Sequence, residues 1–86
     1  MDKRLGFVGI MIEDRLKAAR LVNEILSDFG ELIVGRMGLP YGARHCNIIT
    51  LIVDATTDEL GVLTGKLGAL EGVSVKSALS KPAKSD

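Results

Sequence analysis

Two stretches of the chain, residues 5–12 and 46–54, carry apolar side chains at both odd-numbered and even-numbered positions. Neighbouring side chains of a strand point to opposite faces of its sheet, so a stretch that is apolar on both faces predicts a strand covered on both sides. We therefore expect both strands at the centre of a sheet. Their opposed faces carry Leu5, Phe7 and Met11 against Val8, Ile10 and Ile12, and Ile48 and Ile52 against Ile49, Leu51 and Val53.

Between these strands, residues 15–29 place apolar side chains at helical spacing and polar side chains on the opposite side. Asp14 precedes this segment and is the expected N-cap, because a short carboxylate side chain accepts hydrogen bonds from the first free backbone amides. Gly30 is expected to end the helix. The pattern predicts one amphipathic helix whose apolar side covers the sheet.

A second helix is predicted after Thr56 or Thr57, with acidic residues in its first turn, where they favour the positive end of the helix dipole. A leucine stripe at residues 60, 63, 67 and 70 should face the sheet. Gly61, Gly65 and Gly68 form a second stripe on nearly the opposite side. Either the helix tolerates these glycines or is irregular there, or the stripe lets another backbone or a ligand approach closely.

Two weaker strands complete the pattern, at residues 31–38 and 72–79, and Pro40 and Gly42 predict a turn over residues 39–44. The order strand, helix, strand, strand, helix, strand predicts an α+β ferredoxin-like βαββαβ sandwich, in which two helices cover one face of a four-stranded antiparallel sheet. We expect one domain over residues 1–80 and a flexible polar tail over residues 81–86.

This architecture leaves one apolar face of the sheet without helices. Apolar residues make up 47% of only 86 residues, which is high for a chain whose own core is small. We therefore expect a partner subunit on the second face, in a homo-oligomer that is a dimer or a tetramer.

Charge and composition indicate which classes of binding partner are not expected. Eleven basic and eleven acidic residues cancel, and Phe7, Phe29 and Tyr41 are the three aromatic residues, so a nucleic-acid partner is not expected. A single cysteine fits a reducing cytoplasm. No segment approaches 18 consecutive apolar residues, so no membrane partner is expected.

His45 and Cys46 are the chain's one histidine and one cysteine. Adjacent strand residues point to opposite faces, and a closed zinc site needs four ligands, so a metal site is expected only if His45 and Cys46 meet their counterparts across a subunit interface. The alternative is a histidine at a strand end beside a small buried cysteine. No nucleophile, base and orienting group are visible together, so neither an enzyme nor a cofactor is predicted.

Two loops are candidate binding surfaces. Glu13, Asp14 and Arg15 lead into a helix N-terminus, which favours an anionic group. Arg36, Tyr41 and Arg44 surround the predicted turn and are secondary candidates for contact with a ligand or partner.

Four segments, KRLGFVGIMIEDR, ELIVGRMGLPY, ITLIVDATTDELGVLTGKLG and GVSVKSALSK, together resemble a small bacterial family of iron-only hydrogenase system regulators. The resemblance spans residues 3–81. The family's name rests on its association with hydrogenase-related genes, and the resemblance implies an ACT-like form of the ferredoxin fold, similar to the effector domain of nickel-responsive regulators. These residues hold no DNA-binding arm, and their single histidine and cysteine do not match the several histidines of the nickel site.

The resemblance also implies a function. ACT domains bind small molecules between domains, near the loop after the first strand. By position, this implies a ligand site at Ile12, Glu13, Asp14 and Arg15, with Gly61 and Gly65 of a neighbouring subunit as one wall. The sequence thus predicts a regulatory, ligand-sensing module, with a ligand-free interaction scaffold or a metal sensor at His45 and Cys46 as alternatives.

Overall fold

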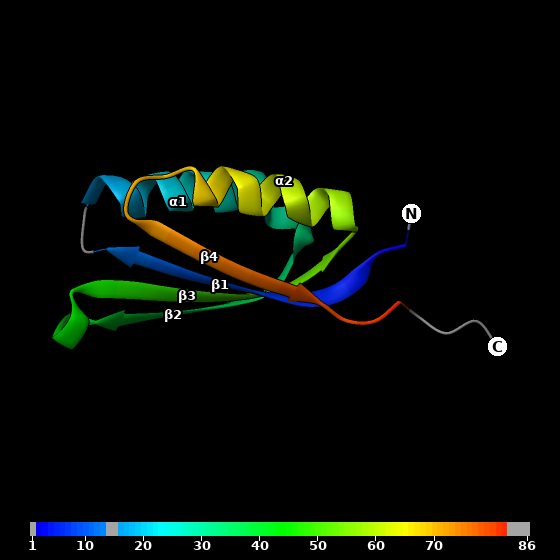
Figure 1. Ribbon diagram of the computed structural model, residues 1–86, viewed down its shortest axis with the longest axis horizontal. Coiled ribbons are helices and arrows are strands. Elements are labelled where there is room, and N and C mark those ends of the chain that lie inside the picture. Colours follow the sequence, from blue (N-terminus) through cyan, green and yellow to red (C-terminus); the bar gives the residue numbers. More distant parts are fainter. Residues whose placement is uncertain (1, 14–15, 83–86) are drawn as a thin grey trace.

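The computed structural model describes residues 2–13 and 16–82 and has the predicted α+β architecture (Figure 1). Four antiparallel strands form one sheet in the order β2-β3-β1-β4, so the two strands predicted to be central are central. Figure 1 shows both helices on one side of this sheet. The elements are β1 (Arg4–Glu13), α1 (Leu16–Asp28), the 3-10 turn η1 (Gly30–Leu32), β2 (Ile33–Tyr41), the 3-10 turn η2 (Gly42–Arg44), β3 (Cys46–Ala55), α2 (Thr57–Gly68) and β4 (Val73–Leu79).

The buried core lies between the helices and the inner face of the sheet. Val8 pairs with Leu51 and Ile10 with Ile49, and their side chains are buried under the helices. Three members of the predicted leucine stripe of α2 are buried and Leu70 is partly buried, so the predicted orientation of this helix is confirmed. The core consists of Val8, Ile10, Ile12, Ala18, Val22, Leu26, Leu32, Ile49, Leu51, Val53, Ala55, Leu60, Leu63 and Leu67.

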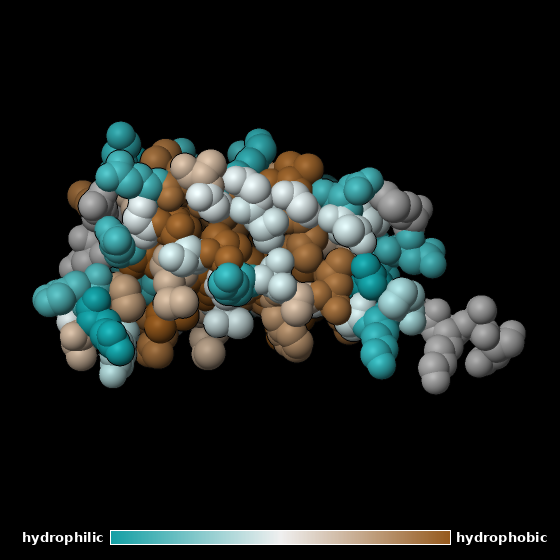
Figure 2. Space-filling view, viewed as in Figure 1, coloured by the Kyte–Doolittle hydropathy of each residue, from teal (hydrophilic) through white to brown (hydrophobic). Residues whose placement is uncertain are grey.

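The opposite side of the sheet, which we call the open face, carries large apolar side chains with no cover. Phe7 is 62% exposed and Met37 is 68% exposed, although both lie within regular strands. In Figure 2, which views the molecule from the β4 edge with the helices above the sheet, brown and tan residues line the middle of the lower margin, where the open face lies. The predicted second apolar face is confirmed, and its large exposed side chains are Leu5, Phe7, Met11, Met37, Leu39, Tyr41 and Ile52.

β2 is longer than predicted. The turn prediction for residues 39–44 is wrong at its start, because Leu39, Pro40 and Tyr41 continue the pairing with β3. Proline is tolerated there because an edge strand leaves one side of its backbone unpaired. The chain turns instead through η2 and His45, whose φ of 52° is left-handed. The pairing of β2 with β3 shifts register at a bulge between Ile33 and Gly35.

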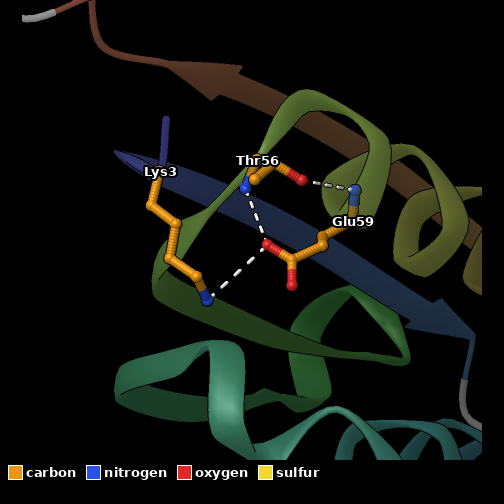
Figure 3. Close-up of polar contacts among 3 residues, drawn as sticks. All are labelled: Lys3, Thr56 and Glu59. Carbon is orange, nitrogen blue, oxygen red and sulfur yellow. Dashed lines mark hydrogen bonds and ion pairs between the residues drawn. The ribbon is translucent and has the colours of Figure 1, made fainter. Parts of the chain in front are cut away.

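The start of α2 is fixed by a capping box, and Thr56, not Thr57, is the N-cap (Figure 3). The Glu59 amide donates to Thr56 Oγ1 at 3.1 Å, and the Thr56 amide donates to Glu59 Oε1 at 2.9 Å. Lys3 Nζ lies 3.6 Å from the same carboxylate oxygen. The hydrogen bond from the Thr56 backbone, helped by the Lys3 charge, lowers the pKa of Glu59 below its ordinary value.

The other helix boundaries agree closely with the sequence pattern. α1 ends at Asp28, one residue before the predicted end, and Gly30 opens the short turn η1. Asp14, the expected N-cap of α1, and Arg15 lie outside the described residues. β4 ends at Leu79, and of the predicted tail only Lys81 and Pro82 lie within the described residues, both exposed and outside regular structure.

Candidate functional site: a groove between α1 and β2

A groove of about 320 Å³ lies between α1 and the edge strand β2, on the helix side of the sheet. Ile33, before the bulge of β2, packs against the core, whereas the β2 residues that point to this side after the bulge are Arg36, Gly38 and Pro40, opposite Leu51, Ile49 and Asn47 of β3. None of the three is a large apolar side chain that would anchor a helix, so the helical layer does not close over β2. The groove is therefore a direct result of the β2 sequence.

The cationic group of the groove is Arg36. Its Nη2 donates a hydrogen bond to Asn23 Oδ1 at 2.6 Å, and Asn23 Nδ2 donates to the Ala19 carbonyl of α1 at 3.0 Å. This second bond fixes the Asn23 amide with its oxygen toward Arg36. No carboxylate within residues 2–13 and 16–82 pairs with Arg36. A guanidinium has five N–H donors, so most of them remain available to an anion.

The floor of the groove is apolar except for one amide. Ile12 and Ile49 are buried core residues, and the half-buried Asn47 lies between Ile12 and Pro40 in the sheet. The Asn47 side chain makes no hydrogen bond to any other part of the described chain. A primary amide can donate two hydrogen bonds and accept two, so Asn47 is a second polar group for a ligand.

This arrangement is suited to binding an anion. A guanidinium, an amide and an apolar floor match a small organic anion with an apolar body. Among the described residues that line the groove, there is no serine, cysteine or histidine that could act as a nucleophile or base. Across the described segments of the chain, no three histidine, cysteine, aspartate or glutamate side chains gather closely enough to hold a metal ion.

The structure brings two of the sequence-predicted site residues together. Ile12 and Arg36 were predicted for different surfaces, and both line the groove. Glu13 ends β1 opposite Cys46, and its amide donates to the Gly72 carbonyl at 2.8 Å, so its backbone lies beside the groove's floor without lining it. Asp14 and Arg15 lie outside the described residues.

The other predicted contact residues lie elsewhere. Gly61 and Gly65 are on the exposed side of α2, where an added Cβ would meet nothing within 4 Å. Their role as a wall contributed by a neighbouring subunit stays a prediction. Tyr41 ends β2 on the open face, and Arg44 is exposed in η2.

Sequence reasoning missed Asn23 and Asn47. Asn23 fell on the polar side of a helix, where asparagine draws no attention. Asn47 had a usable signal, because it is the polar residue that β3 projects toward the core side, whereas Thr50 and Asp54 project toward the open face.

His45 and Cys46 lie at the start of β3. His45 is exposed in its left-handed conformation, and Cys46 is half-buried on the open face between Tyr41 and Glu13. A metal site that uses both across a subunit interface stays a hypothesis.

Comparison with known proteins places this geometry in context. Residues 4–77 match the model of a family described as "TM1266-like: Iron-only hydrogenase system regulator, putative". The structure of the uncharacterized protein TM1266 from Thermotoga maritima is 42% identical, covers 93% of this chain and 100% of its own, and superimposes with a TM-score of 0.90. Among curated proteins, no relative of this chain is found.

More distant structures share the fold alone. The ACT domain of the GTP pyrophosphokinase of Chlorobium tepidum is 22% identical over 88% of this chain and 99% of its own, with a TM-score of 0.74. The C-terminal domain of the MgtC protein of Mycobacterium tuberculosis is 18% identical over 99% and 96%, with a TM-score of 0.72. These likenesses make the fold ACT-like. Neither helix of the described chain has the length and apolarity needed to cross a membrane.

Proposed function

Because this chain belongs to the family of iron-only hydrogenase system regulators, we propose that it is a non-enzymatic regulatory module that senses a small molecule. It works in the cytoplasm as a homo-oligomer, a dimer or a tetramer. The ligand is a small organic anion, such as an amino acid or another carboxylate with an apolar body. A protein partner reads the ligand-bound state.

The observation that carries this proposal is the Arg36 guanidinium, which is held in place by Asn23 and has no carboxylate partner in the described chain. Arg36 is exposed, so in the unliganded chain water solvates its remaining N–H donors, and an anion can replace that water. A ligand carboxylate could pair with the guanidinium through two parallel hydrogen bonds. The buried floor at Ile12 and Ile49 would select for an apolar body.

Ligand binding would act through the position of the groove. α1 and the edge strand β2 form its two walls, so a bound anion would tie Asn23 and Arg36 together. A ligand shifts an equilibrium only by its difference in affinity between two states. We propose that the two states differ in the position of α1 relative to β2, and that the protein partner reads this difference.

Thermal unfolding of the whole chain in the presence of amino acids and small carboxylates tests this function. A ligand at a hundred times its dissociation constant should stabilise the folded state by about 2.7 kcal/mol, which a melting curve detects easily. The stabilisation should disappear in Arg36→Gln and persist in Arg44→Gln, the matched control, because Arg44 lies outside the groove.

A melting shift that survives in Arg36→Gln would place the ligand elsewhere. If no small anion shifts the curve, the ligand-free interaction scaffold becomes the better description of the chain. A shift produced only by nickel or zinc, and lost in Cys46→Ser, would favour the metal sensor.

A further inference from the structure

We propose that the open face is the surface through which two copies of this chain pair, sheet against sheet. The inference rests on the homo-oligomer of the proposed function and names the interface that this oligomer uses. It does not depend on the ligand groove, which lies on the other side of the sheet.

The area of the open face matches what a stable pair needs. Its seven large apolar side chains, from Leu5 to Ile52, are each between 42% and 68% exposed. A large side chain carries about 150–250 Å² of surface, so these seven expose on the order of 700 Å². The largest apolar patch of a typical monomer is about 300–600 Å², whereas each partner of a standard interface buries roughly 800 Å².

The surface shape of the open face is suited to packing against another sheet. Gly9 and Thr50 are paired in the middle of the sheet and form a low row, where a Cβ added to Gly9 would meet only the Lys76 carbonyl at 3.9 Å. Larger side chains rise on both sides of this row, with Phe7 and Ile52 on one side and Met11 on the other. Two stacked sheets pack about 10 Å apart with interdigitating side chains, which such alternation allows.

A pocket of about 240 Å³ adds an anchor point at one end of the face. Its walls are almost wholly apolar and include Leu5, Phe7, Ile52 and Ala78. A large apolar side chain from the second copy would fill it. In a two-fold pair the same contact occurs twice, so one pocket in the chain gives two anchors in the dimer.

Charge favours a second copy over a charged partner. In the part of the open face that runs from Leu5 to Met11 along β1, two charged residues point outward. They are Asp54, which pairs with Leu5, and Lys76, which pairs with Gly9. One negative and one positive group leave this region neutral, so two identical faces do not repel each other. A nucleic acid or an anionic lipid surface would find no excess of positive charge there.

Sedimentation equilibrium of the full chain tests the interface. The wild type should associate, and Ile52→Glu and Phe7→Glu should each weaken association by about 100-fold or more, because a carboxylate would be buried without a partner. Val62→Glu is the matched control, since Val62 is equally apolar and half-exposed but lies on α2. Its association should equal that of the wild type.

Each other outcome decides against a part of the account. If Ile52→Glu and Phe7→Glu keep the wild-type mass, the subunits meet through a different surface and this inference is wrong, while the homo-oligomer stands. If the wild type is a monomer at about 100 µM, the proposed homo-oligomer and the proposed interface are both wrong, and the open face binds a different partner. Should the glutamate variants not fold by circular dichroism, Ala78→Trp decides, because it fills the pocket without adding charge and should also weaken association.

Discussion

The two faces of the sheet are built from the same kinds of side chain but have different surroundings. Leu51 and Ile52 are neighbours in β3, yet Leu51 is fully buried under the helices and Ile52 is 42% exposed on the open face. Two helices can cover only one face, so the apolar residues of the other face are surplus to the fold of one chain. An apolar pattern that the chain's own elements cannot bury is therefore information about assembly.

The ligand groove shows the converse. There the inner face of the sheet is left partly uncovered, because β2 presents Arg36, Gly38 and Pro40 where β1 and β3 present branched apolar residues. The open face has apolar groups in excess, and the groove has a polar interruption in the buried layer. The open face therefore suits another copy of the chain, and the groove suits a small ligand.

The largest contrast between the faces should come from the neighbours Leu51 and Ile52. Leu51→Ala should cost about 2–5 kcal/mol of unfolding free energy, because it opens a cavity in the closed core. Ile52→Ala should cost less than about 1.5 kcal/mol when measured at protein concentrations low enough to dissociate any oligomer. Urea unfolding of both variants gives the two values, and equal costs would show that the open face is as well packed as the inner one.

Two glycines of β1 should differ in the same way. A Cβ added to Gly6 would lie 2.6 Å from the Ala78 carbonyl oxygen and 2.7 Å from Leu79 Cδ2, whereas one added to Gly9 on the open face has ample room. Gly6→Ala should therefore destabilise the chain by about 1–3 kcal/mol through forced separation of β1 and β4. Gly9→Ala, the matched control, should leave thermal unfolding of the dissociated chain nearly unchanged, and a similar loss in both variants would be contrary to this account.

The glycine stripe of α2 gives a smaller effect of opposite sign. Gly65 lies within a regular helix and nothing approaches it in the described chain, so Gly65→Ala should stabilise the folded chain by up to about 1 kcal/mol. Gly72→Ala is a control that should destabilise, because Gly72 has a φ of 80°. Thermal unfolding measures both. Stabilisation accompanied by weaker ligand binding or association would support the stripe as a contact surface, and destabilisation by Gly65→Ala would contradict the exposed position.

The smallest expected effect concerns the capping box that starts α2. The pKa of Glu59 is lower in the folded chain than its ordinary value of 4.5, so its stabilising contribution is present above that value and is lost as the pH falls through the folded pKa. Glu59→Gln keeps a capping-box side chain but removes this titration. Urea unfolding at about pH 6 and about pH 3 should show a larger acid-induced loss in the wild type than in Glu59→Gln. Identical losses would refute the role assigned to this carboxylate.

Most of the fold could be predicted from the sequence, because its signals are local. The apolar residues on both faces of residues 5–12 and 46–54 predicted the central strands, and the leucine spacing predicted the buried side of α2. The end of β2 was missed because Pro40 and Gly42 are turn residues, and only pairing with β3 shows that the edge strand continues to Tyr41.

The groove could be predicted only in part. Arg36 and Ile12 were singled out, but for separate surfaces, since their proximity depends on how α1 docks beside β2. The hydrogen bond between Arg36 and Asn23 joins a strand and a helix whose relative position no local pattern records. The open face could be predicted because the prediction requires only two facts. The central strands are apolar on both faces, and two helices can cover only one face of the sheet.

Methyl NMR with a soluble paramagnetic probe tests the central claim, that the open face is covered by a second copy. Met11 and Met37 both lie on this face, and their methyl signals report directly on contact with solvent. If two copies pair through the open face, both signals are protected from the probe in the wild type at high concentration and become broadened in Ile52→Glu, while Val62 on α2 is broadened in both. Equal broadening of Met11, Met37 and Val62 in the wild type would show that the open face stays in water, and would contradict the account.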